Sequence, residues 1–308
     1  MHGLNQKILE PSAVYWWQGK PNFGDMLNHP MLDYMRCEHL EPEQIRQLRP
    51  DQAEGIAIGS VLDMLMKGKN INPEFNNRPV KVWGSGFLRP PISNDEAFVK
   101  ELQIYALRGR KSKERCEKIL GYSLDNVPLG DPGLLVKRIY PHVKPEPNCD
   151  VGIIYHHRDA KSQPCLEKIV FRRKSFRILD ISVNPDIFVE QVSRCRVILS
   201  SAMHPLICAD SMGIPNCHII VSDNKDVLSY KFEDYYSVFH NYNYCPIDLR
   251  TPLATIGDDT IDLLSANYQY RLSEIENICN RLEEVFPFPR KGSLMIEKSD
   301  LLSGGICS

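Results

Sequence analysis

The sequence predicts an α/β fold built on parallel sheets. Short apolar runs, typical of buried strands, alternate along the chain with segments of helical spacing. This alternation indicates parallel strands joined by crossover helices. The chain of 308 residues is longer than one hydrophobic core usually supports, so two α/β domains or one large domain are expected. Hydrophobic residues at 43% and charged residues at 25% are typical of a soluble globular protein.

The first half of the chain begins this alternation. Its apolar runs with strand character are residues 55–58, 80–83 and 103–107. After the third run, residues 112–120 have helical spacing, and Gly121 stands where a glycine commonly ends a helix. We therefore expect a strand followed by a helix over 103–120.

A proline-rich stretch divides the chain. Residues 141–148, PHVKPEPN, combine prolines with polar side chains, which is typical of a linker. We expect an N-terminal Rossmann-like domain over 1–145 and a C-terminal one over 146–259. A long helical segment over 260–285 closes the fold, and we expect residues 260–290 to pack back on the N-terminal domain.

The second half of the chain repeats the pattern. Its expected strands are residues 150–155, 176–180, 197–199 and 218–221. A helix is expected over 185–193, between the second and third of these strands. The C-terminal domain is therefore expected to contain a parallel sheet of its own.

Charge and cysteine content narrow the classes of partner. Lys and Arg number 37 against 39 Asp and Glu, a net charge of -2, which argues against a nucleic-acid-coating surface but leaves room for a local basic cleft. The ten cysteines form no Cys-x-x-Cys pair, so we expect reduced thiols in a cytoplasmic protein. Residues 1–12 lack the pattern of a secretory signal, and no apolar run approaches the length of a membrane span, so we expect at most peripheral membrane contact.

A histidine stands where a buried strand passes into a helix. The stretch SSAMHPLICADSMGIP, residues 200–215, follows the strand at 197–199 and contains His204. In an open parallel sheet this junction faces the ligand crevice. Ser200 and Ser201 are candidates for the helix N-cap, and the free N–H groups of the first turn favour an anion. A purely structural histidine is the alternative.

Two further strand ends carry polar side chains. YHHRD, residues 155–159, follows the first strand of the second half, so it is expected to face the same crevice as His204. A substrate contact and a plain polar loop are both open for His156, and His157 is interpreted as incidental. Arg108 leaves the strand at 103–107 beside Gly109, which lets the backbone come close to a ligand, so anion binding and a plain surface arginine are both open. No third ligand recurs at helical spacing and no carboxylates cluster, so no metal site is expected.

Three other segments have two interpretations each. In NFGD, Asn22 and Asp25 suit an Asx turn and an N-cap, and the same turn can hold Asp25 toward a sugar hydroxyl. The loop WGSG after the strand at 80–83 has the small residues of a ligand-approach loop, although Gly-x-Gly alone is a weak signal. YKFEDYY, from Tyr230, is able either to stack on a sugar or to pin the domains together.

Four motifs in a fixed order carry a family resemblance. They are NFGD at 22–25, LRGRKS at 107–112, LGDPGLL at 129–135, and ILSSAMHPLICADSMGIP followed by YKFEDYYS. Together they resemble the polysaccharide pyruvyl transferase family, and the last element resembles exopolysaccharide ketal-pyruvyl transferases. The resemblance implies two facing Rossmann-like domains with a central cleft, similar to GT-B glycosyltransferases. It also implies phosphoenolpyruvate as donor, a lipid-linked or nucleotide-linked sugar as acceptor, a role in exopolysaccharide or capsule synthesis, and no cofactor.

The resemblance and the strand-end argument together give a set of candidate site residues. The catalytic candidates are His204, His156 and Asp25. The donor-binding candidates, mostly in the C-terminal domain, are Arg108, Gly109, Arg158, Ser200, Ser201, Met203 and Lys231. The acceptor-binding candidates are Asn22, Gly24, Trp83, Ser85 and Tyr235. Relatives commonly read Asp-Arg-Leu-His before the helix, whereas Ala202 stands here in the place of the arginine. Arg158 or Lys231 is expected to supply the missing cation.

The implied reaction needs a proton donor near neutral pKa, and histidine provides one without strong tuning. Two other functions are compatible with the same fold and crevice. One is a GT-B glycosyltransferase that uses a nucleotide-sugar. The other is a non-catalytic Rossmann-like binding protein, which would bind a ligand without releasing phosphate.

Overall fold

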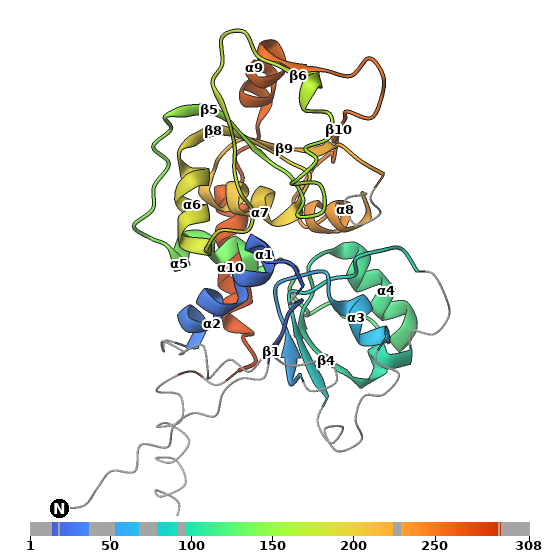
Figure 1. The fold of residues 1–308 in the computed structure, drawn as a ribbon. Coiled ribbons are helices and arrows are strands. Elements are labelled where there is room, and N and C mark those ends of the chain that lie inside the picture. Colours follow the sequence, from blue (N-terminus) through green and yellow to red (C-terminus); the bar gives the residue numbers. More distant parts are fainter. Residues whose placement is uncertain are drawn as a thin grey trace, which may run out of the picture.

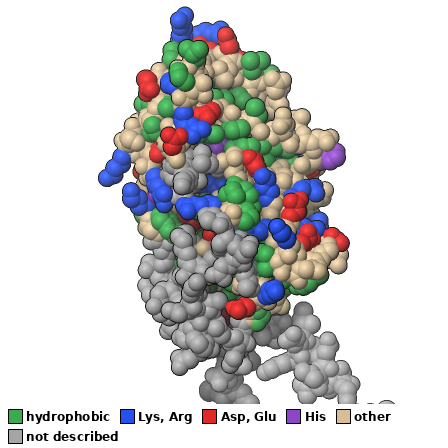
Figure 2. All heavy atoms as spheres, turned by 90° about the vertical axis from the view of Figure 1, so that its right-hand side faces the viewer, with side chains coloured by type: hydrophobic (Ala, Val, Ile, Leu, Met, Phe, Trp, Pro, Cys, Tyr) green, Lys and Arg blue, Asp and Glu red, His purple; other side chains and the backbone are tan. Residues whose placement is uncertain are grey.

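The computed structural model describes residues 14–17, 19–36, 53–67, 79–91, 97–223, 229–288 and 290. Residues 1–12, on which the expectation about a secretory signal rests, lie outside this part of the chain. Figure 1 shows two sheets, one in the lower and one in the upper part of the molecule, with helices between and around them. Acidic and basic side chains lie side by side on the face drawn in Figure 2, in keeping with the small net charge.

The first sheet is parallel throughout. Within the described residues its strands run in the order β1-β2-β3-β4. These strands are β1 (Val14–Tyr15), β2 (Gly55–Ile56), β3 (Val80–Trp83) and β4 (Leu102–Ala106). Strands in sequence order, each parallel to the next, require a crossover between every pair, which is the arrangement that the alternating pattern predicts.

The second sheet is also parallel, in the order β10-β9-β8-β5-β7 among the described residues. Its strands are β5 (Cys149–Ile154), β7 (Phe176–Ile178), β8 (Cys195–Ser200), β9 (Asn216–Ile220) and β10 (Ile247–Asp248). Two further strands pair beside it, β6 (Ile169–Val170) and β11 (Ile256–Gly257). The predicted α/β fold with parallel sheets is confirmed.

The helices cover both sheets. They are α1 (Phe23–Met26), α2 (Asn28–Arg36), α3 (Leu62–Lys67), α4 (Arg110–Leu120), α5 (Val136–Ile139), α6 (Pro185–Ser193), α7 (Met203–Met212), α8 (Tyr230–Tyr236), α9 (Asp258–Asn267) and α10 (Leu272–Glu284), with 3-10 turns η3 (Ala97–Glu101), η4 (Pro132–Leu135) and η5 (Leu166–Lys168). The helix expected over 185–193 is confirmed as α6. The helix expected over 112–120 is confirmed as α4, and Gly121 caps it at φ 76°, a backbone angle that favours glycine.

Helices from both halves of the sequence form one core. In the ribbon, α1, α5 and the upper part of α10 lie between the two sheets, below α6 and α7, and α2 lies beside the first sheet (Figure 1). Phe23 of α1 stacks on Phe188 of α6 with ring centroids 4.4 Å apart, and both side chains are fully buried. Segments from before residue 145 therefore pack on the helices of the second sheet, and the domain boundaries given above remain a prediction.

The expected continuous helix over 260–285 is wrong in one respect. The chain forms two helices, because Tyr268 takes an extended conformation after α9 and helix geometry resumes only at α10. The end of α10 and the residues after it reach the first sheet. The indole Nε1 of Trp83 donates to the carbonyl of Leu282 at 2.9 Å, and Nζ of Lys81 donates to the carbonyl of Pro287 at 3.0 Å.

No helix in the described part of the chain is long and apolar enough to cross a membrane.

Candidate active site

A pocket of about 120 Å³ lies between the two sheets. Its walls are loops that follow β2, β3 and β5, together with the first residues of α1, α7 and α8. We call it the central pocket. Because β2 and β3 belong to the first sheet and β5 to the second, the pocket faces the carboxyl ends of strands of both sheets, which is where open α/β folds bind ligands.

His204 lines the central pocket as the second residue of α7. The N-cap is Ala202, and it makes no side-chain capping bond. The expectation that Ser200 or Ser201 caps this helix is therefore wrong. Both serines are fully buried and serve the backbone: the Ser200 hydroxyl donates to the carbonyl of Ile154, and the Ser201 hydroxyl accepts from the amide of His156. They hold the loop, and neither serine lines the central pocket.

Asp131 lies behind His204, and sequence reasoning did not select it. Oδ2 of Asp131 is 3.8 Å from Nε2 of His204, Asp131 is fully buried, and neither atom has a hydrogen-bond partner among the described residues. Oδ1 of Asp131 accepts from the amide of Gly133 and caps η4, which fixes the carboxylate. A buried carboxylate aimed at a histidine is the usual means of orienting an acid–base imidazole. Asp131 belongs to the motif LGDPGLL, residues 129–135, but nothing local in this motif indicates a contact with His204.

Gly24 fits against the other side of the imidazole. A Cβ atom at this position would lie 1.9 Å from Nδ1 of His204, so any side chain larger than hydrogen would displace the ring. Asn22 begins α1 as its N-cap, and its side-chain oxygen accepts from the amide of Asp25. The predicted Asx-type cap is confirmed. Asn22, Gly24 and Asp25 all line the central pocket.

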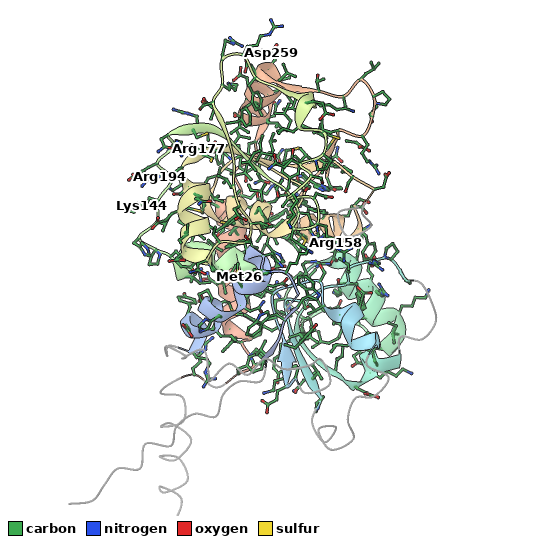
Figure 3. All side chains as sticks on the ribbon, viewed as in Figure 1. Met26, Lys144, Arg158, Arg177, Arg194 and Asp259 are labelled. Carbon is green, nitrogen blue, oxygen red and sulfur yellow. The ribbon has the colours of Figure 1, made fainter. Side chains whose placement is uncertain are left out.

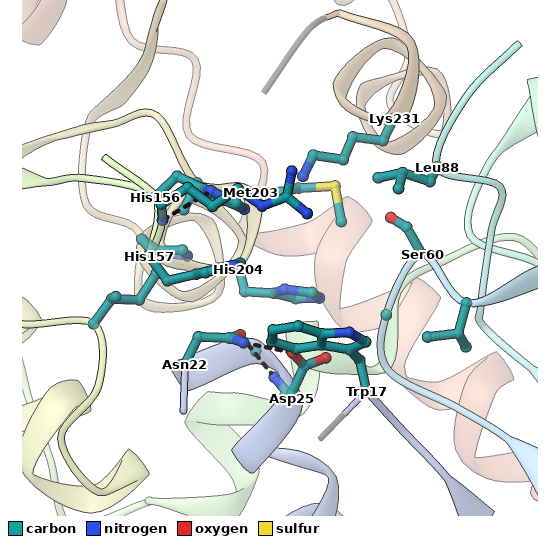
Figure 4. Close-up of a pocket in the computed structure, with 17 residues that line it drawn as sticks. Trp17, Asn22, Asp25, Ser60, Leu88, His156, His157, Met203, His204 and Lys231 are labelled. Carbon is teal, nitrogen blue, oxygen red and sulfur yellow. Dashed lines mark hydrogen bonds between the residues drawn. The ribbon is translucent and has the colours of Figure 1, made fainter. Parts of the chain in front are cut away.

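The carboxyl group of Asp25 has an unusually high pKa. Burial raises the pKa of Asp25 to about 6, while the hydrogen bond from Asn22 and the positive charges of His204 and Lys231 act in the opposite direction. The side chains of His204, Trp17 and Asp25 converge on one space from three different segments (Figure 4). Asp25 is consequently able to change its protonation state close to neutral pH.

Two cations reach the central pocket from the second half of the chain. Lys231 is 7% exposed and enters from α8, and Arg158 enters from the loop after β5. Figure 3 shows Arg158 at the junction of the upper and lower parts of the molecule, and Figure 4 shows Lys231 pointing into the pocket. These are the two residues expected to supply the positive charge of the arginine whose place Ala202 takes. Met203 also lines the pocket, between the loop of Arg158 and α8.

The two adjacent histidines both line the central pocket. His156 is 8% exposed, and its ring lies 4.1 Å from that of His157. The ring of His157 lies 5.2 Å from that of Trp17, which itself lines the pocket. His157 therefore forms part of the pocket wall together with an aromatic side chain, and its interpretation as incidental stays a prediction.

Arg108 does not line the central pocket. It is fully buried, and its guanidinium forms an ion pair with Asp234 of α8, with Nε and Nη2 at 3.0 and 2.9 Å from Oδ2. Nη2 also donates to the carbonyl of Phe87, and Nη1 donates to the hydroxyl of Ser60, which does line the pocket. Arg108 was expected to contact the donor directly. In the structure it lies behind the pocket wall and supports Ser60, which lines the pocket.

The remaining candidates are also held inside the protein. A Cβ atom at Gly109 would lie 1.8 Å from the carbonyl oxygen of Asp234, so this glycine permits close packing of α8. Ser85 donates to the carbonyl of Gly59, and Tyr235 donates to the carboxylate of Asp210. Trp83, Ser85 and Tyr235 are fully buried, and none of them lines the central pocket. YKFEDYY was expected either to stack on a sugar or to pin the domains together. The contacts of Asp234 and Tyr235 agree with the second interpretation.

Sequence reasoning also missed residues from the first sheet. Gly59 and Ser60 follow β2, Leu88 follows β3, and all three line the central pocket. The rule that sites gather at the carboxyl ends of parallel strands would have found them, since the runs at 55–58 and 80–83 were expected strands.

The comparisons with known proteins agree with the sequence motifs. A model of the polysaccharide pyruvyl transferase family matches residues 22–224. Uncharacterized protein L143 of Acanthamoeba polyphaga mimivirus is 26% identical over 205 residues, which cover 61% of this chain and 67% of that protein.

Two solved structures are similar over most of the chain. An alpha-glucosyltransferase in complex with UDP and a 13-mer DNA has a TM-score of 0.38 at 9% identity, covering 94% of this chain and 98% of that chain. The wall teichoic acid polymerase TagF has a TM-score of 0.36 at 10% identity, covering 96% and 88%.

Proposed function

Because this chain belongs to the polysaccharide pyruvyl transferase family, we propose that it transfers the pyruvyl group of phosphoenolpyruvate to a sugar of a polysaccharide precursor. The product is a pyruvate ketal, and phosphate is released. The acceptor sugar is carried on a lipid or a nucleotide, and the reaction takes place in the cytoplasm, at the inner face of the membrane when the carrier is a lipid.

The observation that carries this proposal is the position of His204. Its Nε2 faces the buried carboxylate of Asp131, while the rest of its ring borders a pocket that also contains a lysine, an arginine and a titratable carboxyl. Imidazole is suited to deliver a proton near neutral pH, and a carboxylate behind it stabilises the protonated form. This geometry supports general acid catalysis by His204.

The donor carries a phosphate and a carboxylate, so it requires converging cations. Lys231 and Arg158 meet this requirement from two different elements of the central pocket. The first turn of α7 begins at the same place, and its free N–H groups favour an anion. The cations also stabilise the phosphate as it leaves.

His204 gives a proton to C3 of the enol while one sugar hydroxyl attacks C2, and Asp25 accepts the proton of that hydroxyl. The C–O bond to phosphate breaks, and a second hydroxyl closes the ketal at C2 with its proton passing to phosphate. Proton return from Asp25 restores His204. Asp25 and the neighbouring Asn22 stand on the side of α1, where we place the acceptor.

Phosphate release tests this function directly. Purified protein is incubated with phosphoenolpyruvate and a panel of lipid-linked and nucleotide-linked hexoses, and both phosphate and the ketal product are measured. Release that depends on the acceptor supports the proposal. Turnover of UDP- or GDP-sugars without turnover of phosphoenolpyruvate would replace it with glycosyl transfer, and binding of phosphoenolpyruvate without phosphate release would replace it with a binding protein.

The pH dependence of the reaction follows from Asp25. A base must be ionised to act, and the pKa of this carboxyl is raised to about 6, so kcat/KM is expected to rise with pH through that value. Asp25→Asn is expected to abolish this limb of the profile and to lower kcat/KM at pH 8 by about 100-fold. A variant that retains the limb near pH 6 would assign it to another group and remove Asp25 from the chemistry.

A further inference from the structure

A second cavity, of about 610 Å³, adjoins the central pocket. We call it the side cavity. The two share His157 and Ile181 in their walls. In the second sheet β5 lies between β8 and β7, the central pocket lies beyond the ends of β5 and β8, and the side cavity lies beyond the ends of β5 and β7. Both therefore occupy the edge of the sheet at which parallel strands present ligands.

The lining of the side cavity mixes charges with an apolar surface. Lys20 and Lys161 are exposed, and Asp180 brings a negative charge to the same cavity wall. Oδ1 of Asp180 accepts from the amide and the hydroxyl of Ser182 at 2.9 and 2.6 Å, which fixes this carboxylate at the cavity wall. Ile178 is 39% exposed and offers an apolar face beside these groups.

The wall also contains an unpartnered buried hydroxyl. Tyr155 is 2% exposed, and its hydroxyl has no hydrogen-bond partner among the described residues. Burial raises the pKa of Tyr155 to about 12, so the hydroxyl keeps its proton and is able to donate as well as accept. A buried polar group without a partner is costly, so a ligand group or water that reaches this hydroxyl gains a hydrogen bond.

We propose that the side cavity binds the saccharide units of the acceptor that lie next to the sugar in the central pocket. The inference rests on the proposed function. Hydroxyl, carboxylate, amide and ammonium groups beside an apolar face are suited to a chain of sugar hydroxyls and ring C–H surfaces. An anionic carrier is less well matched, because the carboxylate of Asp180 lies in the same cavity wall as the two lysines. His157 stands where the chain passes from one cavity to the other.

The test measures how affinity depends on acceptor length. Immobilised mono- to hexasaccharides serve as probes in a glycan array, with surface plasmon resonance for those that bind. The wild-type protein is expected to bind oligosaccharides more tightly than the matching monosaccharides. Tyr155→Phe combined with Asp180→Ala is expected to reduce the gain from added units by about tenfold, the loss of two or three hydrogen bonds, and to leave monosaccharide binding unchanged.

The controls separate this inference from the reaction itself. Asp125→Ala and Tyr122→Phe change exposed side chains that line neither the central pocket nor the side cavity, and they are expected to keep the length dependence. Phosphoenolpyruvate binding by the double variant should equal that of the wild type. An unchanged length dependence in the double variant, or a gain produced by a diphosphate on a monosaccharide in place of added sugars, would overturn the proposal. Binding on the array needs no turnover. The array therefore tests the side cavity even if no phosphate is released.

Discussion

Replacing His204 by glutamine is expected to lower kcat for phosphate release by about 100-fold or more, the usual contribution of a positioned general acid. Glutamine preserves much of the size of histidine and is able to hydrogen-bond, but it has no proton to deliver near neutral pH. Binding of phosphoenolpyruvate should change much less, because Lys231 and Arg158 remain in the central pocket. The measurement is steady-state turnover, with donor affinity followed separately by calorimetry.

Asp131 provides the second half of the same experiment. Asp131→Asn preserves shape but removes the charge that faces Nε2 of His204 at 3.8 Å, so the imidazole loses the group that orients and stabilises its protonated form. Turnover is expected to fall by a factor comparable to that of His204→Gln, and the double variant should be little worse than either single one. His142→Gln, at an exposed histidine outside the pocket, serves as the control. Near-normal turnover by folded His204→Gln protein would make this histidine structural and move the acid to His156 or Asp25.

Much of the fold was predictable because it depends on local patterns. Apolar runs of strand length and the helix over 185–193 appear where the sequence places them, since buried parallel strands and capped helices leave strong short-range signals. The break between α9 and α10 was missed. The residues at this break include no proline or glycine, so nothing local marks the point at which Tyr268 turns away from helix geometry.

The site was predictable where strand ends determined it. His204, His156 and Arg158 follow β5 and β8, and the rule for parallel sheets is sufficient to bring them to one pocket. Long-range partners were not predictable. No local pattern indicates that Asp131 meets His204 or that Arg108 meets Asp234, because each pair joins segments that only tertiary packing brings together.

Replacing Arg108 by alanine is expected to lower the free energy of unfolding by about 3–5 kcal/mol. The ion pair with Asp234 has no exposure on either side, and the amide and hydroxyl of Ser112 also donate to this carboxylate at 2.8 and 2.7 Å. Removing the guanidinium leaves a buried negative charge with neutral donors alone. The measurement is urea unfolding at pH 7, with the midpoint and slope both followed.

Two further variants decide between a structural and a donor-binding role for Arg108. Arg108→Met together with Asp234→Leu replaces both charges by apolar side chains of similar volume, and it is expected to recover most of the lost stability, because no buried charge is left unpaired. Arg194→Ala removes the exposed pair with Glu146 and should cost less than about 1 kcal/mol. Since the pair fixes α8, and Lys231 enters the pocket from that helix, the double variant should bind phosphoenolpyruvate nearly as well as the wild type if its stability recovers. Full stability in Arg108→Ala with selective loss of phosphoenolpyruvate binding would instead restore Arg108 as a direct phosphate contact and require the pocket to reach one layer deeper than these contacts place it.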